Sequence, residues 1–182
     1  MLRGDTLYLT PLDPANAEIA RAWMNDPEIN RYLLTGQVPI TREQEVSFYE
    51  RTAARYAAGT GYVFEIHVAA DGRYVGNCGL DKVDMRHRSA EIGILIGELD
   101  AQNSGYGRDA IRTLLRFGFD TLGLHRIAIK CQADNDRGMH LYPKLGFREV
   151  GRERDATYTF GKWVDEAVFD ILDSEWRARD TR

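Results

Sequence analysis

A polar, glycine-containing segment near the middle of the chain carries the groups that an anion site needs. It reads Gln102-Asn103-Ser104-Gly105-Tyr106-Gly107-Arg108 and lies between an apolar run and the start of a helical pattern. Glycines let a ligand approach the backbone closely, and consecutive N–H groups at a helix start point toward an anion. The segment therefore predicts a cradle suited to a pyrophosphate.

Two common phosphate loops do not match this segment. A P-loop requires GxxxxGK[ST], which the sequence lacks. A dinucleotide fingerprint requires GxGxxG, whereas here Gly105 and Gly107 are followed by Ala110. Taken alone, the glycine pair fits an ordinary strand-to-helix turn about as well, and Arg108 fits a solvated helical residue about as well.

The cysteines and histidines do not indicate a metal site or a disulfide framework. Cys78 and Cys131 have no CxxC spacing, and no HExxH pattern is formed by His67, His87, His125 and His140. We expect buried free thiols in a reducing compartment. Cys131 could act as a nucleophile, but no histidine is near it in the sequence, so a core thiol is the better interpretation.

The second half of the chain supplies the elements that must position this segment. Asp71-Gly72 predicts a hairpin between strands 62–69 and 74–84, and residues 89–97 predict a buried third strand. The helix from Gly105 should turn Ala110, Ile111, Leu114, Leu115, Gly118 and Leu122 inward. A strand over 126–132, a helix over 135–145 closed by Gly146, and strands over 147–154 and 163–172 follow.

The first half predicts one strand and two helices. A strand over 6–11 precedes a helix that Asp13-Pro14 begins and that Asn25-Asp26-Pro27 breaks after Met24. Thr41-Arg42-Glu43-Gln44 is a capping box for a helix that ends at Gly59. The segment before Pro39 should be irregular, and the tail 173–182 should be loose.

Length and composition restrict the class of protein. The 182 residues, 43% hydrophobic, suit one domain, and no run of residues is long and apolar enough to span a membrane. A net charge of −4 argues against nucleic acid as a partner, because phosphate binding needs a basic face. We expect a cytoplasmic protein with no membrane partner.

The order of these motifs resembles the GCN5-related N-acetyltransferases (GNAT). The resemblance rests on QxxGxG after an apolar strand, then helix, strand, asparagine and LYxKLGF, and it covers roughly 62–172. Trp23 to Ile29 and Arg31-Tyr32-Leu33 look like the subgroup that contains the ribosomal-protein N-terminal acetyltransferases. The implied fold is a single α/β (α+β) domain, with a mixed, mostly antiparallel sheet splayed at an acyl-CoA cleft and helices on both faces.

The resemblance assigns the parts of the chain. Residues 1–60 would supply N-terminal helices and acceptor-side loops, 61–172 the acetyl-CoA-binding core, and 173–182 a tail. Ile94, Leu95 and Ile96 would be the splayed strand whose backbone pairs with the pantetheine arm, although they also fit a simple core. The pyrophosphate would be held by Gln102, Asn103, Ser104, Gly105, Tyr106, Gly107 and Arg108.

Two further residues follow from the same resemblance. Asn135 is either an ordinary helix cap or a cofactor contact. Tyr142 lies where the family commonly places a tyrosine near the thioester sulfur, where a phenol can protonate the departing thiolate. A half-buried aromatic residue is the alternative. Pro143 should kink this helix and alter the aim of Tyr142.

The general base is harder to place. An alkylamine is mostly protonated at neutral pH, so a carboxylate or a water chain should accept a proton. Glu91 is the best candidate, although it also fits a solvated strand end. Some relatives have a glutamate where this chain has Lys130, which cannot act as a base while it is charged.

These features predict an enzyme that transfers an acetyl group from acetyl-CoA to a primary amine by direct attack in a ternary complex, without a metal. The alternatives are an acyl-CoA-binding regulatory module without turnover and a transferase of longer acyl groups. The acceptor could be a protein N-terminus, a polyamine, an aminoglycoside-like compound or an amino acid. Specificity should reside in loops such as 32–40. Relatives are often dimers, which is the basis for a possible homodimer.

Overall fold

The strands of the computed structural model join in one eight-stranded sheet of order β1-β2-β3-β4-β5-β6-β8-β7. The structure describes residues 1–33 and 38–180. Every neighbouring pair is antiparallel except β5 and β6, which are parallel. The expected mixed, mostly antiparallel sheet is therefore confirmed. The strands are β1 (Leu2–Arg3), β2 (Leu7–Pro11), β3 (Tyr62–Val68), β4 (Tyr74–Asp84), β5 (Ser89–Ile96), β6 (Arg126–Gln132), β7 (Arg148–Thr159) and β8 (Lys162–Leu172).

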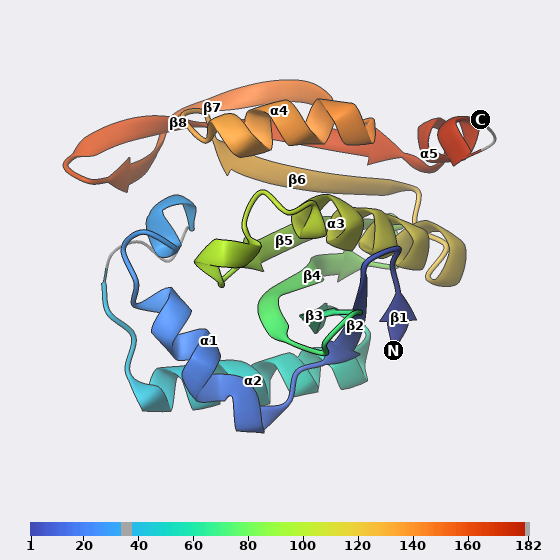
Figure 1. The fold of residues 1–182 in the computed structure, drawn as a ribbon. Helices are drawn as coiled ribbons and strands as arrows, with labels where there is room; N and C mark the ends of the chain where they lie inside the picture. The colour runs from blue at the N-terminus through green and yellow to red at the C-terminus, as the bar shows by residue number, and fades with distance from the viewer. Residues whose placement is uncertain (34–37, 181–182) are drawn as a thin grey trace.

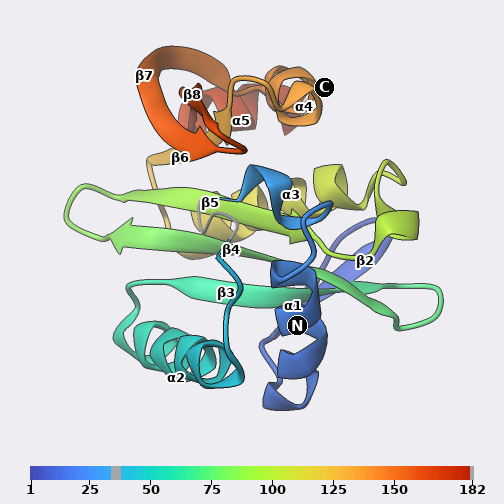
Figure 2. The same cartoon turned by 90° about the vertical axis from the view of Figure 1, so that its left-hand side faces the viewer.

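Helices surround this sheet. Figure 2 shows α1 and α2 against the β3–β5 part of the sheet, and α4 and α5 beside β6, β7 and β8. Among the described residues, no helix is long and apolar enough to cross a membrane. The helices are α1 (Ala17–Met24), α2 (Arg42–Ala58), α3 (Tyr106–Arg116), α4 (Asp136–Leu145) and α5 (Asp173–Asp180). Short turns are η1 (Pro14–Asn16), η2 (Asn30–Tyr32), η3 (Leu99–Ala101) and the π-helical η4 (Phe117–Thr121).

Local signals set the helix ends as the sequence predicts. The Thr41 side chain accepts from the Gln44 N–H while the Gln44 side chain accepts from the Thr41 N–H, so the capping box is complete. Gly59 ends α2 in the left-handed region, with φ of 70°. Asp13 caps η1, and this 3-10 turn leads into α1.

The two faces of β5 pack against different helices, which fixes the strand in place. On one face, Ile94 and Ile96 pack against the main core, to which α3 contributes Ile111 and Leu114. On the other face, Leu95 packs against a smaller cluster of α1 and β4 residues, Ala20, Trp23 and Tyr74. Alternate side chains point to opposite sides of a strand, so side-chain packing holds β5 on both faces while its backbone groups pair with β4 along one edge and with β6 over part of the other.

A buried carboxylate ties the N-terminus of the chain to the start of α3. Asp109 is 7% exposed and accepts hydrogen bonds from the Asp5 N–H at 3.0 Å and the Thr6 N–H at 2.7 Å. The Thr6 hydroxyl donates to it as well, at 3.0 Å. These bonds fix the position of the first turn of α3, which follows the glycine-containing segment.

Helix α3 and strand β7 differ from the sequence-based expectation. The α-helical part of α3 ends at Arg116, and the π turn η4 follows, which leaves Leu122 only half-buried. Strand β7 continues to Thr159 instead of ending at Arg154. Most of β7 is solvent-exposed, because it is the edge strand beyond β8, so its residues show no alternation of polar and apolar types.

The expected loose tail is wrong, because residues 173–180 form helix α5. Trp176 is 6% exposed, belongs to the main core, and lies 6.3 Å from the Phe119 ring centroid. The Asp173 carboxylate lies 3.0 Å from His125 Nδ1, which joins the start of α5 to the loop before β6. The buried Trp176 indole and the Asp173–His125 contact hold α5 on the domain, although the polar composition of the segment suggested a loose tail.

Candidate active site

The sheet opens between its two parallel strands. Pairing of β5 with β6 runs from Ser89 opposite Arg126 to Ile92 opposite Ile129 and then stops. Both strands continue, β5 to Ile96 and β6 to Gln132. The other edge of β5 stays paired with β4 as far as Ile96. The N–H and C=O groups that face β6 over residues 93–96 therefore have no strand partner, and an extended ligand can pair with them as an added strand would.

The glycine-containing segment lies directly beyond this open edge. Gly105 has φ of 88° and stands at the N-cap of α3, where no side chain caps the helix. The first hydrogen bond of the helix runs from the Asp109 N–H to the Gly105 oxygen at 3.1 Å. The N–H groups of Tyr106, Gly107 and Arg108 therefore have no helical acceptor. A Cβ added at Gly105 would meet no atom within 4 Å, so the space beside Gly105 is open.

The Trp23 indole packs against the end of β5, the strand that precedes this segment. A Cβ at Gly97 would lie 2.0 Å from the Trp23 ring, so only glycine fits there. The Trp23 Nε1–H donates to Glu98 Oε1 at 3.1 Å. Helix α1 therefore fixes the end of β5, a role for Trp23 that the sequence did not reveal.

Arg108 and Gln102, two of the expected phosphate ligands, differ from each other in their contacts. Arg108 is exposed and has no ion-pair partner among the described residues. The Gln102 Nε2–H donates to the Ile96 oxygen at 3.2 Å, and its Oε1 accepts from Arg137 Nη1. Gln102 thus links the end of β5 to the first turn of α4. This contact places Arg137 beside the glycine-containing segment, a role that the sequence analysis missed. The available signal was its position two residues after Asn135, the cap of α4.

Asn135 caps α4 and borders the packing around Tyr142. Its side-chain oxygen accepts from the Gly138 N–H at 3.2 Å, so the cap interpretation is confirmed. A Cβ at Gly138 would lie 3.2 Å from Cys131 Sγ, 3.3 Å from Asn135 Nδ2 and 3.3 Å from Tyr142 Cε2. Asn135, Cys131 and Tyr142 therefore surround this glycine, where any larger residue would displace them.

Tyr142 is a buried phenol on α4. Its ring lies 5.6 Å from the Phe169 ring centroid and 6.1 Å from that of Phe147, and the residue is 6% exposed. Burial raises the pKa of the phenol above its ordinary value, with a smaller contribution from Cys131. Its hydroxyl has no hydrogen-bond partner in the described part of the chain. Helix α4 continues through Pro143 to Leu145, so the proline does not end the helix.

Cys131 is a protonated core thiol. Its residue is 6% exposed, and burial raises its pKa to about 11. Its Sγ lies 3.7 Å from Met139 Sδ. The thiolate that nucleophilic catalysis requires is therefore scarce at neutral pH. Cys78 is likewise buried and free, as expected.

Glu91 lies in an ion pair on the face of β5 opposite α3. Its Oε2 is 2.9 Å from Lys82 Nζ, and its side chain is 23% exposed. Lys130 on β6 forms ion pairs with Glu153 at 2.8 Å and Glu166 at 3.3 Å. These carboxylates, Glu153 first, raise the pKa of Lys130, so it is charged and cannot act as a base. In the described residues, no cluster of His, Cys, Asp or Glu has the form of a metal site.

Comparisons with known proteins identify the family of this chain. A family model described as "Acetyltransferase (GNAT) domain" matches residues 6–148. The chain is 30% identical to the uncharacterized N-acetyltransferase YoaA of Bacillus subtilis, over 94% of this chain and 96% of that protein. It is 28% identical to the putative ribosomal N-acetyltransferase YdaF of the same organism, over 91% and 90% of the two chains.

A solved structure shares the fold. The spermidine N-acetyltransferase from Vibrio cholerae, in complex with CoA and spermine, aligns with a TM-score of 0.86 over 94% of this chain and 98% of that chain, at 24% identity. The chain belongs to the GNAT acetyltransferase family, and it is an N-acetyltransferase.

Proposed function

We propose that this protein transfers an acetyl group from acetyl-CoA to a primary amine, on a protein N-terminus or a small molecule, by direct attack in a ternary complex. The observation that carries the proposal is the unpaired edge of β5 over residues 93–96, which leads to unpaired N–H groups at the start of α3. One region thus offers strand-like pairing for an amide-containing arm and donors for a pyrophosphate.

The residues present fit this acyl donor. Gln102 to Arg108 would hold the pyrophosphate, because no side chain caps the start of α3 and the space beside Gly105 is open. Arg108 and Arg137 would add positive charge at that place. Ile94, Leu95 and Ile96 would pair with the pantetheine arm through their backbone while their side chains stay in the two packing clusters. Asn135 would contact the donor from the start of α4.

Acetyl-CoA supplies a thioester whose acyl carbon an uncharged amine can attack. The chain would align the two reactants, and a backbone N–H of β5 would polarise the acyl oxygen. Tyr142 would donate its proton to the departing sulfur. The raised pKa of this phenol suits the role, because the group stays protonated at neutral pH.

Glu91 would accept the proton that the amine loses, directly or through water. It lies on β5 just before the strand leaves β6, on the side opposite α3. Its ion pair with Lys82 must loosen for the carboxylate to reach this proton. The match to a putative ribosomal N-acetyltransferase supports a place in the ribosomal-protein N-terminal subgroup, whereas the spermidine enzyme supports small amines as acceptors.

A thiol-release assay with a panel of amines tests the proposal. Acetyl-CoA should lose its acetyl group only when an accepted amine is present, and peptides with free N-termini and polyamines should be compared at equal concentrations. Tight binding of acetyl-CoA without turnover on any amine would instead indicate a regulatory module. A preference for longer acyl-CoA donors would indicate a different acyl transferase.

A further inference from the structure

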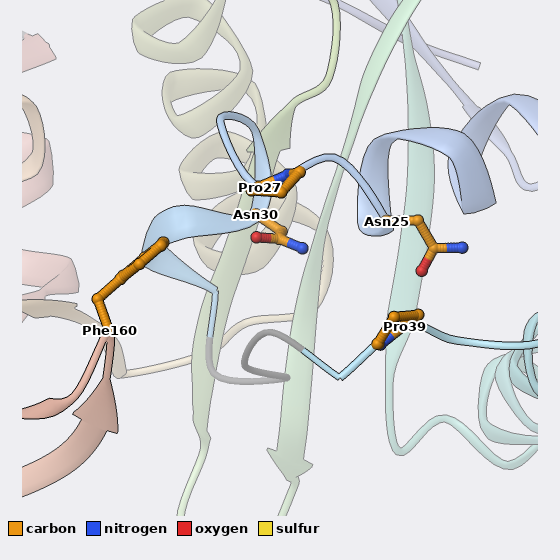
Figure 3. Close-up of a pocket in the computed structure, with 5 residues that line it drawn as sticks. All are labelled: Asn25, Pro27, Asn30, Pro39 and Phe160. Carbon is orange, nitrogen blue, oxygen red and sulfur yellow. The ribbon is translucent and has the colours of Figure 1, made fainter.

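A pocket of roughly 270 Å³ lies between the α1–α2 connection and the tip of the β7–β8 hairpin (Figure 3). It is lined by Asn25, Pro27, Asn30, Pro39 and Phe160. In Figure 1 the α1–α2 connection and the hairpin lie at the left, beside the ends of β5 and β6. The Tyr32 hydroxyl, next along the chain, lies 3.5 Å from the backbone oxygen of Asp134, just after β6. The pocket therefore stands at the end of the sheet where β5 and β6 have parted.

An unsatisfied amide oxygen lies in the wall of this pocket. Asn30 is 5% exposed, and its Nδ2 donates to the Met24 oxygen at 2.7 Å. Its Oδ1 is buried without a hydrogen-bond partner among the described residues. Figure 3 shows this oxygen on the side of the amide that faces Phe160. A buried acceptor without a donor is costly, so the position favours a ligand that brings an N–H or O–H group.

The second asparagine of the lining does not share this property. The Oδ1 of Asn25 accepts from the Ile40 N–H at 2.7 Å, and its Nδ2 donates to the Ile40 oxygen at 3.0 Å. Asn25 thus uses both ends of its amide to hold the loop before α2. In the described part of the lining, the unsatisfied group is therefore an acceptor, and it belongs to Asn30.

The described lining of the pocket offers a cation no charged partner. Among the described residues, this lining holds no carboxylate, and a buried cation needs one as a partner. The Arg31 guanidinium lies 5.8 Å from the Phe160 ring centroid and 5.4 Å from that of Tyr32, so positive charge is already present. The nearby Asp134 carboxylate is paired through Oδ2 with Lys162 at 2.7 Å, and its buried Oδ1 has no hydrogen-bond partner among the described residues, but Asp134 is not one of the described lining residues.

We propose that this pocket binds a neutral hydrogen-bond donor of the acceptor substrate, an amide N–H or a hydroxyl on apolar carbon. The donor bonds Asn30 Oδ1, and the carbon contacts the rings of Pro27, Pro39 and Phe160. This inference rests on the proposed function, since it describes the acceptor of the same reaction. It favours amines of peptide-like chemistry over polyamines, whose other nitrogens are cationic at neutral pH.

Acceptors that share one reactive amine and differ at the far end test the proposal. At the end away from the reactive amine, ω-amino amides carry a neutral hydrogen-bond donor and α,ω-diamines carry a cation. Simple alkylamines of matched length carry no donor there. The amides should have kcat/KM roughly tenfold above the alkylamines, about the value of one hydrogen bond, and above the diamines as well. Diamines that match or exceed the amides would overturn the proposal.

Variants of two lining residues sharpen the test. Asn30→Leu should remove the preference for amides over alkylamines while acetyl-CoA affinity stays unchanged. Phe160 is 51% exposed at the hairpin tip with φ of 47°, a conformation that Asn and Asp tolerate. Phe160→Asp should therefore fold and supply the missing carboxylate, raising kcat/KM for diamines roughly tenfold relative to amides. The neutral Phe160→Asn is the matched control and should not.

Binding separates this proposal from the proposed function. Calorimetry of each amine with the CoA-bound protein needs no turnover, and the amides should bind more tightly than the diamines in wild type but not in Asn30→Leu. If no amine is acetylated yet this order of affinity holds, the proposed function fails and the pocket assignment stands. If amines are acetylated but neither the far-end group nor Asn30→Leu changes affinity, the pocket assignment is wrong.

Discussion

Tyr142 combines a buried ring with a hydroxyl that has no partner in the described chain, and this combination suits a proton donor better than a packing residue. A packing role alone would be served equally by phenylalanine. The ring contacts with Phe169 and Phe147 fix the direction of the hydroxyl. Removing the hydroxyl therefore separates chemistry from packing.

Tyr142→Phe should lower kcat by roughly ten- to a thousandfold, while stability and acetyl-CoA affinity change little. Because burial raises the phenol pKa above its ordinary value of 10, the acid form persists on the alkaline side of neutrality. The wild-type kcat should then show no loss of a general acid below about pH 10. Steady-state kinetics across pH and a cofactor titration measure both. Full activity of the variant would transfer the proton-donor role to water.

Glu91 and Lys82 form a pair whose members can be tested against each other. If Glu91 accepts the proton from the amine, Glu91→Gln should lower kcat roughly a hundredfold. Lys82→Met breaks the same ion pair but keeps the carboxylate, so it should keep most of the activity. Equal effects of the two variants on kcat would reduce Glu91 to a structural ion-pair partner.

At the scale of elements, the junction between β5 and α3 contains most of the groups that we propose to bind acetyl-CoA. Asp109 fixes the start of α3 through its bond with the Thr6 N–H, and Trp23 packs on Gly97 at the end of β5. Gln102 bonds both Ile96 of β5 and Arg137 of α4. The loop between them is therefore held at both ends while its N–H groups stay free. A rigid, unpaired set of donors is what binding of an anion requires.

Gly107→Glu should abolish acetyl-CoA binding while the protein stays folded. A Cβ at Gly107 would lie 3.8 Å from Ile96 Cγ1, an ordinary contact, so the backbone tolerates a side chain. The glutamate places bulk and negative charge where the pyrophosphate should lie. Gly107→Ala is the matched control and should bind nearly as well as wild type. Circular dichroism and calorimetry give fold and affinity; unaltered affinity in Gly107→Glu would remove this loop from the site.

Helix α5 gives a test of stability that is independent of the site. Trp176→Ala should reduce the free energy of unfolding by about 3 kcal/mol, because a buried indole leaves a cavity in the main core. Trp163, which is 60% exposed on β8, is the control, and Trp163→Ala should change stability by no more than about 0.5 kcal/mol. Denaturant titrations measure both. Equal losses would contradict the packing described for α5.

For the molecule as a whole, local signals in the sequence were sufficient for most elements but not for their contacts. The capping box at Thr41, the Asp71-Gly72 hairpin and the apolar run of β5 each depend on neighbouring residues, and each is confirmed. Helix α5 and the length of β7 were missed because they depend on tertiary contacts: Trp176 on the core and β7 on β8.

The candidate site shows the same limit. The motif from Gln102 to Arg108 predicted a helix start with free donors, and the structure contains one. No sequence pattern could show that Gln102 bonds Arg137, that Glu91 pairs with Lys82, or that Asn30 has an unsatisfied oxygen. The Gln102–Arg137 bond joins residues far apart in the chain, and the Glu91–Lys82 pair depends on which face of a strand each side chain occupies. The unsatisfied Asn30 oxygen depends on the packing around it. The expected specificity loop 32–40 includes residues 34–37, which lie outside the described residues.

The most direct test of the central claim is a product balance on purified protein with acetyl-CoA and an accepted amine. Free thiol and N-acetylated amine, measured together by absorbance and mass spectrometry, should appear in equal amounts. Both should depend on the amine, both should be lost in Gly107→Glu and kept in Gly107→Ala, and the protein should carry no added acetyl group. Thiol release that does not need the amine, or an acetylated Cys131 in the reacting protein, would contradict direct transfer in this cleft.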